Sequence, residues 1–188
     1  SIYPLYLKIL ITGSAYSYEY TQLILNNSSL SVQSKTDELT KVLNRRGFIE
    51  LGQKSIDLAL EMKNTGIIFF IDMDGLKTIN DTYGHKMGDE AIKAQALVLK
   101  KALRMNDVVG RIGGDEFVAL MVTDDQNYTC EDLYQKLKNH IGLYNDNTTK
   151  PYNISISIGV SDFTCRDNIS LQTLIDTADH RQYLDKNN

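Results

Sequence analysis

Cysteine is scarce in this sequence, and long hydrophobic runs are absent from it. The two cysteines, Cys130 and Cys165, are widely separated, so they form neither a disulfide framework nor the spacing of a metal site. We interpret them as reduced thiols of a cytoplasmic domain. No apolar run approaches the roughly 18 residues that a membrane-spanning helix needs, and no signal peptide is expected.

A basic excess is also lacking. The 188 residues carry a formal net charge of -4, and an acidic balance argues against a protein that binds nucleic acid through general electrostatics. Hydrophobic residues make up 42% of the chain, which is enough for one core with an appendage. Because the chain starts at Ser1 and not at Met, we expect it to be a piece of a longer protein.

A change in composition divides the chain into two regions. Residues 1–36 are rich in Ser, Tyr and Asn and carry few charges. We interpret them as the end of an upstream domain and a connector, with a strand expected over residues 2–11 and a helix over residues 19–35. The periodic patterns sharpen from Asp37, so residues 37–188 are predicted to form the main domain.

The main domain is predicted to alternate helices and strands. The continuous apolar run "GIIFFID" at residues 66–72 suits a strand buried on both faces, and Thr36 is expected to cap the helix before it. Thr129 and Asp132 form a capping-box pattern at the start of a later helix. The predicted elements are a helix within residues 36–64, a strand at 66–72, a helix at 88–104, a strand hairpin at 107–122, a helix at 129–144, a strand at 152–163 and a helix at 170–186. This order predicts an α/β fold, an α+β sandwich in which helices flank a central, mostly antiparallel sheet.

One pair of carboxylates stands inside the predicted hairpin. In "RIGGDEFVAL", residues 111–120, Gly113 and Gly114 suit a tight turn, but a plain turn does not require Asp115 and Glu116 side by side. Adjacent carboxylates repel each other unless a cation or a shared proton holds them.

A second acidic cluster follows the buried strand, where Asp72 and Asp74 stand. It is not an EF-hand loop, because the sixth position counted from Asp72 is Lys77 and not Gly, and the twelfth is Tyr83 and not Glu. No Walker-type phosphate loop is present. A short glycine-containing loop, Lys77 and a helix N-terminus instead predict a phosphate cradle, beside which an Asp can hold Mg²⁺.

The two acidic clusters meet if the 66–72 strand lies next to the hairpin. Asp72 then faces Asp115 and Glu116, and two or three carboxylates surround a divalent cation. Such a site suits nucleotidyl transfer, in which metal ions activate an attacking hydroxyl and neutralise phosphates. In this interpretation the glycines let a phosphate or a base approach the backbone, and the carboxylates hold the metal.

Residues 113–117 spell Gly-Gly-Asp-Glu-Phe, and the chain resembles the GGDEF family, the diguanylate cyclases. The similarity covers about residues 37–186 and rests on blocks in the family's order: "DELTKVLNRRGF", "DMDGLKTINDTYGHKMGDE", "RMNDVVGRIGGDEF", "ISIGV" and "ADHRQYLDK". It implies the fold of adenylyl cyclases and polymerase palms. It also implies condensation of two GTP into cyclic di-GMP with release of pyrophosphate, Mg²⁺ or Mn²⁺ as the metal, a homodimer of half-sites, and an upstream sensory domain.

The resemblance assigns roles to individual residues. It implies that the metal ligands are Asp72, the backbone of Met73 and Asp115, and that Glu116 is a further ligand or the group that assists deprotonation of the 3′-hydroxyl. The catalytic residues are then Asp72, Asp115 and Glu116. The resemblance also implies that guanine binds Asn80 and Asp89, that Lys77, Lys186, Gly113 and Gly114 bind the substrate phosphates, and that product binds an inhibitory site at Arg104 and Asp107. A carboxylate such as Asp89 accepts hydrogen bonds from guanine N1–H and the 2-amino group, and adenine offers neither.

Each of these residues also has a structural interpretation. Gly113 and Gly114 alone make a hairpin turn. Asp89 alone suits a helix N-cap, and Arg104 with Asp107 suits a surface ion pair. For the whole domain, the alternative to the enzyme is a catalytically weak GGDEF domain that senses GTP or cyclic di-GMP. An adenylyl-type cyclase is a distant third hypothesis, which Asp89 opposes.

The chain departs from the family pattern at some positions. Lys41 replaces a usual glycine, which is expected to alter the first helix. Arg181 and Gln182 stand where small and apolar residues are usual. The sequence ends at Asn188, before a basic residue that the family often supplies to the phosphates.

Overall fold

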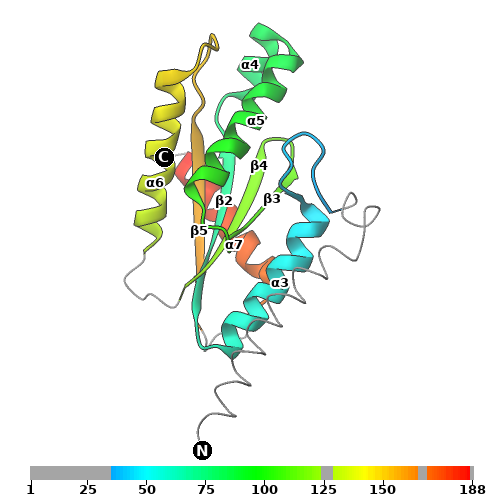
Figure 1. Ribbon diagram of the computed structural model, residues 1–188, viewed down its shortest axis with the longest axis vertical. Coiled ribbons are helices and arrows are strands. Elements are labelled where there is room, and N and C mark those ends of the chain that lie inside the picture. Colours follow the sequence, from blue (N-terminus) through cyan, green and yellow to red (C-terminus); the bar gives the residue numbers. More distant parts are fainter. Residues whose placement is uncertain (1–34, 124–128, 165–168, 187–188) are drawn as a thin grey trace, which may run out of the picture. The chain divides into compact units, whose positions relative to one another are not determined.

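The computed structural model of this chain describes residues 35–123, 129–164 and 169–186, the last five by their backbone alone. The strand and the helix expected before Lys35 lie outside the described residues. The elements below belong to the compact unit that begins at Asp37. In chain order (Figure 1) they are β1 (Leu43–Asn44), α3 (Arg45–Glu61), β2 (Thr65–Met73), α4 (Leu76–Tyr83), α5 (His85–Ala102), β3 (Val108–Gly113), β4 (Glu116–Thr123), α6 (Cys130–Asn147), β5 (Ile156–Phe163) and α7 (Leu171–Lys186).

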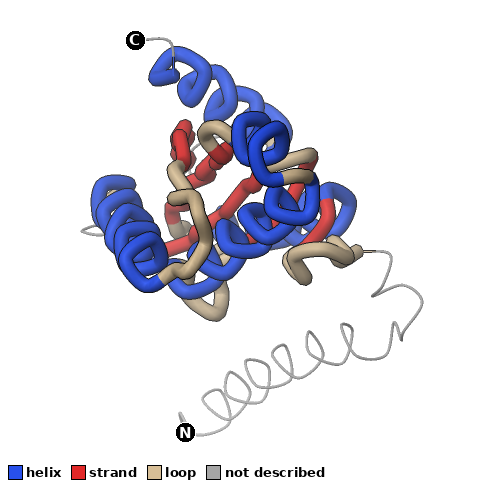
Figure 2. The backbone as a smooth tube through the Cα atoms, turned by 90° about the horizontal axis from the view of Figure 1, so that it is seen from above, coloured by secondary structure: helices blue, strands red, loops and turns tan. Residues whose placement is uncertain are grey.

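The described strands form one five-stranded sheet in the order β1-β3-β4-β2-β5. The short strand β1 pairs parallel with β3, whereas β3 with β4, β4 with β2, and β2 with β5 all pair antiparallel. Figure 2 shows helices on both sides of these strands. The prediction of a mostly antiparallel sheet flanked by helices is therefore confirmed.

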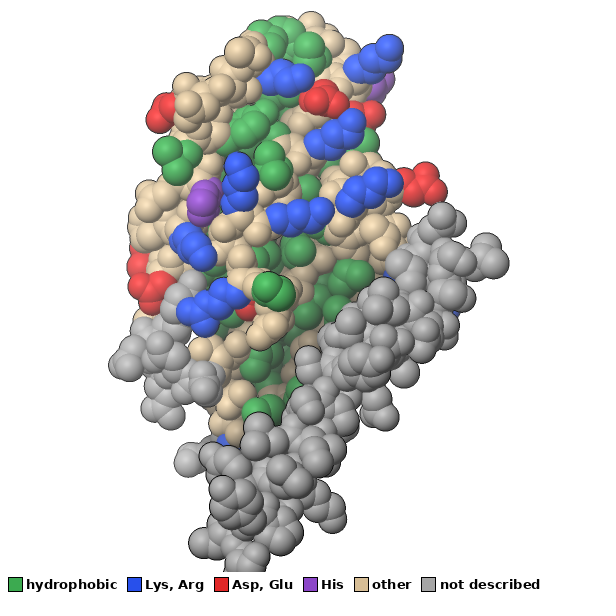
Figure 3. All heavy atoms as spheres, in the orientation of Figure 1, with side chains coloured by type: hydrophobic (Ala, Val, Ile, Leu, Met, Phe, Trp, Pro, Cys, Tyr) green, Lys and Arg blue, Asp and Glu red, His purple; other side chains and the backbone are tan. Residues whose placement is uncertain are grey.

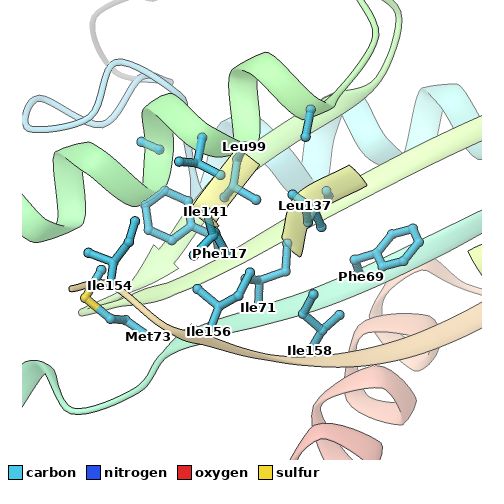
Figure 4. Packing of buried hydrophobic residues seen from close by; sticks show 14 of the residues in the cluster. Phe69, Ile71, Met73, Leu99, Phe117, Leu137, Ile141, Ile154, Ile156 and Ile158 are labelled. Atoms are coloured by element: carbon cyan, nitrogen blue, oxygen red, sulfur yellow. The ribbon is translucent and has the colours of Figure 1, made fainter. Parts of the chain in front are cut away.

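Two hydrophobic clusters fill the space between the sheet and its helices. On one face the strands pack against α4, α5 and α6. Figure 4 shows Phe69 and Phe117 of this face together with Leu99 of α5 and Leu137 of α6. On the opposite face the strands pack against α3 and α7. The domain is therefore a three-layered sandwich, as expected when a sheet must bury both of its faces.

Strand β2 lies inside the sheet and is buried on both faces. Ile67, Phe69 and Ile71 belong to the cluster under α5 and α6, and Ile68 and Phe70 belong to the cluster under α3 and α7. Because successive side chains of a strand point to opposite faces, a strand covered on both sides must be apolar throughout. The prediction for this run is confirmed.

The start of the domain differs from the prediction. Thr36 does not cap a helix, because α3 begins only at Arg45, where the side chain of Asn44 accepts a hydrogen bond from the N–H of Gly47. Residues 37–42 form a turn instead, in which Asp37 accepts hydrogen bonds from the backbone and the hydroxyl of Thr40. A short acidic side chain that bonds to nearby N–H groups competes with the helix.

Lys41 belongs to that turn and not to the first helix, so the expectation that it alters the helix is wrong. Its backbone adopts the left-handed conformation, with φ 58°. Glycine is favoured there because it has no side chain to clash, which explains physically why a glycine at this position would be usual. The lysine is exposed and accepts the strained backbone.

The helix expected at residues 88–104 begins and ends earlier in the chain than predicted. It begins at His85 and ends at Ala102, and Gly84, with φ 85°, joins it to α4. Asp89 therefore lies inside α5 and is not its N-cap. By contrast, the capping box of Thr129 and Asp132 at the start of α6 is confirmed, since both of its reciprocal hydrogen bonds are present.

None of the helices in the described parts of the chain combines the length and the apolar character needed to cross a membrane.

Candidate active site

The pairing of β2 with β4 brings the two acidic clusters together. The last registered pair of these strands is Ile71 with Phe117. Asp72 follows Ile71 and Glu116 precedes Phe117, so the two carboxylates stand at the same end of neighbouring strands. Asp115 lies next to Glu116 in the turn. The expectation that the buried strand lies beside the hairpin is confirmed.

The strand alternation also indicates the face on which these carboxylates lie. Asp72 is two residues beyond Phe70, and Glu116 is two residues before Val118. Phe70 and Val118 both belong to the cluster under α3 and α7. Because residues two apart share a face of a strand, Asp72 and Glu116 are placed on the side of the sheet that carries α3 and α7.

Negative charge is concentrated at this end of the sheet. The pKa of Glu116 is raised, first by burial and then by the charges of Asp72, Asp179 and Asp115, whereas Arg45 acts in the opposite direction. Asp179 of α7 was not among the residues predicted for the site. Its only signal in the sequence was its place in the block "ADHRQYLDK". A cation bound here would relieve the repulsion among these groups.

The donor set fits a hard divalent cation that binds together with a nucleotide. Within the described residues, no three side chains of His, Cys, Asp or Glu are grouped closely enough to hold a metal ion by themselves. Mg²⁺ in nucleotide sites usually takes only one or two carboxylates and completes its shell with phosphate oxygens and waters. Asp72, Asp115 and the carbonyl of Met73 supply donors of that kind.

The signature turn is anchored by an arginine that sequence reasoning missed. The Nε–H of Arg111 donates to the carbonyl of Gly114 at 2.8 Å, and its Nη1 lies 3.1 Å from both carboxylate oxygens of Asp37. Burial raises the pKa of Asp37, but the hydrogen bonds from Thr40 and Arg111 outweigh burial and lower it. The turn is thereby tied to the first residue of the domain.

The two glycines of the turn leave its outer side open. Gly114 has φ 20°, and a Cβ built on it would meet no heavy atom within 4 Å. A Cβ on Gly113 would lie 2.8 Å from Oε2 of Glu116. A side chain at Gly113 would thus displace the Glu116 carboxylate, and a side chain at Gly114 would fill the open approach to the backbone.

The loop after β2 leads into a helix N-terminus that no side chain caps. Gly75, with φ 73°, is the N-cap of α4 and has no side chain to occupy the first N–H groups of the helix. Lys77 is exposed in the first turn. Asp74 is held on β5, since the hydroxyls of Ser155 and Ser157 donate to it at 2.8 and 2.6 Å. The uncapped N–H groups at this helix N-terminus suit an anion.

The predicted guanine-binding residues lie on adjacent helices. Asn80 is on α4 and Asp89 is on α5, and these helices meet at Gly84. A Cβ on Gly88 would overlap the amide of Asn80, so Gly88 lets α5 lie directly against that side chain. Asn80 is half-buried and Asp89 is exposed. Gly88, the neighbour of Asp89 in the chain, therefore lies directly against Asn80.

Arg104 and Asp107 line a hollow that is separate from the carboxylates. The hollow has a volume of about 310 Å³ and is also lined by Asn64, Met105, Asn106, Val122 and Thr123. Val122 and Thr123 end β4, whereas Glu116 begins it. Eight residues of strand span about 25 Å, so the hollow and the carboxylate cluster lie at opposite ends of β4.

The contact between Arg104 and Asp107 goes through the backbone. The N–H of Arg104 donates to Asp107 at 2.7 Å. Burial raises the pKa of Asp107, whereas this hydrogen bond and the charges of Arg104 and Lys136 lower it, and the net direction is upward.

Figure 3 shows Lys and Arg side chains across the middle of the face on which α5 and α6 lie. That face suits an anionic ligand.

Lys186 is the last residue of α7, and its side chain lies outside the described part of the molecule. Its predicted contact with the phosphates therefore stays a prediction. Arg181, earlier in the same helix, donates from Nη1 to the carbonyl of Val160 at 2.7 Å. This bond ties α7 to β5, which explains how an arginine is accommodated where a small residue is usual.

A sheet whose paired strands bring carboxylates together at one end, with helices on both faces, defines the palm-like fold of nucleotidyl cyclases. The chain belongs to the GGDEF family, since a family model described as "Diguanylate cyclase, GGDEF domain" matches residues 34–188.

Curated relatives are named as cyclases. The chain is 31% identical over 172 residues to Diguanylate cyclase A of Treponema denticola, a match that covers 88% of this chain and 45% of that protein. It is 41% identical over 101 residues to Probable diguanylate cyclase DgcC of Escherichia coli, covering 54% and 27% respectively. The chain thus spans less than half the length of these relatives.

Solved structures of GGDEF domains share the fold. The coiled coil and GGDEF domain of DgcB from Caulobacter crescentus, in complex with c-di-GMP, matches with a TM-score of 0.74 at 22% identity, over 96% of this chain and 94% of that one. The GGDEF domain of PA1120 (TpbB or YfiN) from Pseudomonas aeruginosa matches with a TM-score of 0.70 at 27% identity, over 81% and 88%.

Proposed function

We propose that this chain is a diguanylate cyclase domain that joins two GTP molecules into cyclic di-GMP and releases pyrophosphate. The observation that carries the proposal is the meeting of Asp72 with Glu116 and its neighbour Asp115 at one end of paired strands. The uncapped N-terminus of α4 and the Asn80–Asp89 pair support it, as do the names of the curated relatives. The proposal concerns this domain, because the relatives are longer proteins.

The metal would be held by Asp72, Asp115 and the carbonyl of Met73, which leaves Glu116 to accept the proton of the attacking hydroxyl. When bound, Mg²⁺ or Mn²⁺ neutralises phosphate charge and makes the attacking hydroxyl more acidic.

The chain's own residues bind and orient the nucleotide. Asp89 accepts hydrogen bonds from guanine N1–H and the 2-amino group, and Asn80 completes the recognition of the base. Since adenine offers neither donor, ATP would leave the carboxylate unpaired. Lys77 and the N–H groups of α4 orient the phosphates, and Lys186 supplies a second cation.

Both 3′–5′ phosphodiester bonds of cyclic di-GMP are formed by the same reaction. The 3′-hydroxyl oxygen of one nucleotide bonds to the α-phosphorus of the other, and the bond from that phosphorus to pyrophosphate breaks. Glu116 takes the proton of the hydroxyl. The same reaction, with the two nucleotides in exchanged roles, closes the ring and releases a second pyrophosphate.

The product requires two chains. The Asn80–Asp89 pair provides one base site per chain, whereas cyclic di-GMP contains two guanines. Two domains must therefore face each other with their nucleotides antiparallel. The active form in this proposal is a homodimer, which an upstream sensory domain would bring together.

The product, cyclic di-GMP, would inhibit its own synthesis by binding at Arg104 and Asp107. Arg forms strong paired hydrogen bonds with phosphate, and Asp accepts from guanine. A cyclic dinucleotide bound at this hollow would hold two half-sites apart and inhibit synthesis. In this proposal the hollow and the carboxylate site are two coupled sites.

The proposal is tested by incubating the purified protein with GTP and Mg²⁺ and identifying the nucleotide products by chromatography. Cyclic di-GMP is expected from the parent protein. Asp72→Ala and Asp115→Ala are each expected to lower the rate by about a hundredfold or more, because loss of a metal ligand costs several kcal/mol of transition-state stabilisation. Asp57→Ala, an exposed change on α3, is the control. Binding of GTP without turnover would instead support the sensor alternative.

A further inference from the structure

Two tyrosines join the predicted guanine site to the segment before β5. Tyr83 is the last residue of α4, and Tyr152 lies four residues before β5. Their rings lie 6.0 Å apart at 42°. The hydroxyl of Tyr83 donates to the carbonyl of Pro151 at 3.0 Å, and the hydroxyl of Tyr152 donates to the carbonyl of Met87 at 3.0 Å.

These bonds hold both sides of the joint between α4 and α5. Tyr83 is three residues after Asn80, and Met87 is two residues before Asp89. Between them stands Gly84, with φ 85°, where α4 ends and α5 begins. The packing of Gly88 on Asn80 and the contacts to Pro151 and Tyr152 together hold the orientation of α5 on α4, and with it the separation of Asn80 and Asp89.

The Tyr152 hydroxyl is suited to a lasting hydrogen bond. The residue is buried, and burial raises the pKa of its phenol, as do the neighbouring Tyr144 and Glu90. The phenol therefore keeps its proton at neutral pH and remains a donor. An ion pair between Lys150 and Glu90 at 3.5 Å adds a second connection between the same two segments.

The segment that carries Tyr152 also reaches the metal-binding end of the sheet. Ser155 and Ser157 follow it and donate to Asp74 at 2.8 and 2.6 Å, and Ser157 is registered opposite Asp72. One continuous segment, residues 150–157, thus contacts both the helix joint at the base site and the loop at the phosphate site.

We propose that Tyr152, together with Tyr83, is a positioning residue for base recognition, which sets the separation of Asn80 and Asp89 to fit guanine. The inference rests on the proposed function, since it assumes that the pair binds the base of GTP. It adds to that function a specificity device in which Tyr152 lies outside the signature blocks. Tyr152 touches neither substrate nor metal and acts through α5.

Tyr152→Phe and Tyr83→Phe each remove one hydroxyl and leave the ring in place. We expect each to weaken binding of a non-hydrolysable GTP analogue about fivefold, which corresponds to the loss of one hydrogen bond's contribution. We expect KM for GTP to rise to a similar extent while kcat stays within about twofold, because the carboxylate end is untouched. The preference for GTP over ITP, which lacks the 2-amino group, should fall. The melting temperature should fall by only about 2–4 °C, since each variant loses one intramolecular hydrogen bond.

Tyr134→Phe is the matched control, since this tyrosine lies on α6 with its ring 5.3 Å from the Lys138 ammonium. If the parent protein binds no GTP, the proposed function fails and this inference fails with it. If the parent binds GTP but the Tyr152 and Tyr83 variants match Tyr134→Phe in affinity and in GTP:ITP preference, only the positioning role is overturned. Equal losses in kcat, binding and melting temperature would likewise overturn it, since a merely structural role predicts that pattern.

Discussion

Single side chains fix the signature turn through contacts that are distant in the sequence. Arg111 holds the carbonyl of Gly114 and the carboxylate of Asp37, which is 74 residues away in the chain. Asp37 in turn closes the first turn of the domain through Thr40. Both members of the ion pair are mostly buried, with side chains 17% and 20% exposed, so solvent screens the pair only in part.

The lowered pKa of Asp37 predicts a pH dependence of stability. Its folded-state pKa lies below the ordinary value of 3.8, so the carboxylate stabilises the fold fully above that value and loses this contribution as pH falls through the folded pKa. Asp37→Asn should lower the free energy of unfolding by about 1–3 kcal/mol at pH 7. In urea titrations the difference from the parent should shrink below about pH 4.

The control is Asp57→Asn, on the exposed side of α3, which should change stability little at any pH. A gap between parent and Asp37→Asn that stays constant down to about pH 2.5 would show that the Asp37 charge is not the source of the effect.

Gln95 is a polar residue in the hydrophobic core. It is 1% exposed, and among the described residues neither its Nε2 nor its Oε1 has a hydrogen-bond partner. Burying unpaired polar atoms costs about 1–3 kcal/mol. Gln95→Leu, which has a similar size, should therefore raise the free energy of unfolding by about 1–2 kcal/mol in thermal or urea melts. Gln172→Leu, at an exposed position on α7, should not raise it. A less stable Gln95→Leu would mean that the Gln95 amide has hydrogen-bond partners in solution.

At the scale of elements, the hairpin of β3 and β4 connects the two proposed nucleotide sites. Asp107 precedes β3, and Gly113 ends it at the carboxylate cluster. β4 returns from Glu116 to Thr123, which lines the hollow at Arg104. A ligand in the hollow thus contacts the residues just before β3 and the end of β4, at the end of the hairpin opposite the turn that carries the carboxylates.

Arg104→Ala is expected to relieve product inhibition. Loss of paired, charge-assisted hydrogen bonds to a phosphate should raise the cyclic di-GMP concentration for half-inhibition about tenfold or more. The initial rate should stay within about twofold, because the carboxylate site lies at the other end of β4. Progress curves with added product measure both quantities. Arg46→Ala, which changes an exposed arginine on α3, is the control. If product slows the Arg104→Ala variant as early as it slows the parent, Arg104 and Asp107 form only a surface contact.

The elements that could be predicted are those whose signal is local. β2 follows from its apolar run, the hairpin from its glycines, and α6 from its capping box. The start of α3 could not be predicted, because the Asp37 turn depends on Arg111, far along the chain. β1 has only two residues, too few for a pattern, and it exists because β3 offers it a partner.

The candidate site was predictable to a similar extent. Asp72 and Asp115 could be predicted because each stands beside another carboxylate at the end of a predicted strand, and the structure brings these strands together. Asp179, Arg111 and Tyr152 carry no local signal, since what each does depends on neighbours in space that only the sheet register and the helix packing provide. Lys186 remains a prediction, because its side chain lies beyond the described residues.

At the scale of the whole molecule, the proposed function gives each domain one base site and one metal site. The two-base product therefore makes dimerisation the central requirement of the proposed function. Synthesis should then depend on protein concentration, since a half-site alone cannot complete either bond.

The most direct test measures the rate of cyclic di-GMP formation from GTP and Mg²⁺ over a wide range of protein concentration, with oligomeric state followed by light scattering. The proposed function predicts that cyclic di-GMP forms and that the rate per chain rises until the dimer is saturated. GTP bound but left unconverted at every concentration, including those at which the protein is dimeric, would contradict it.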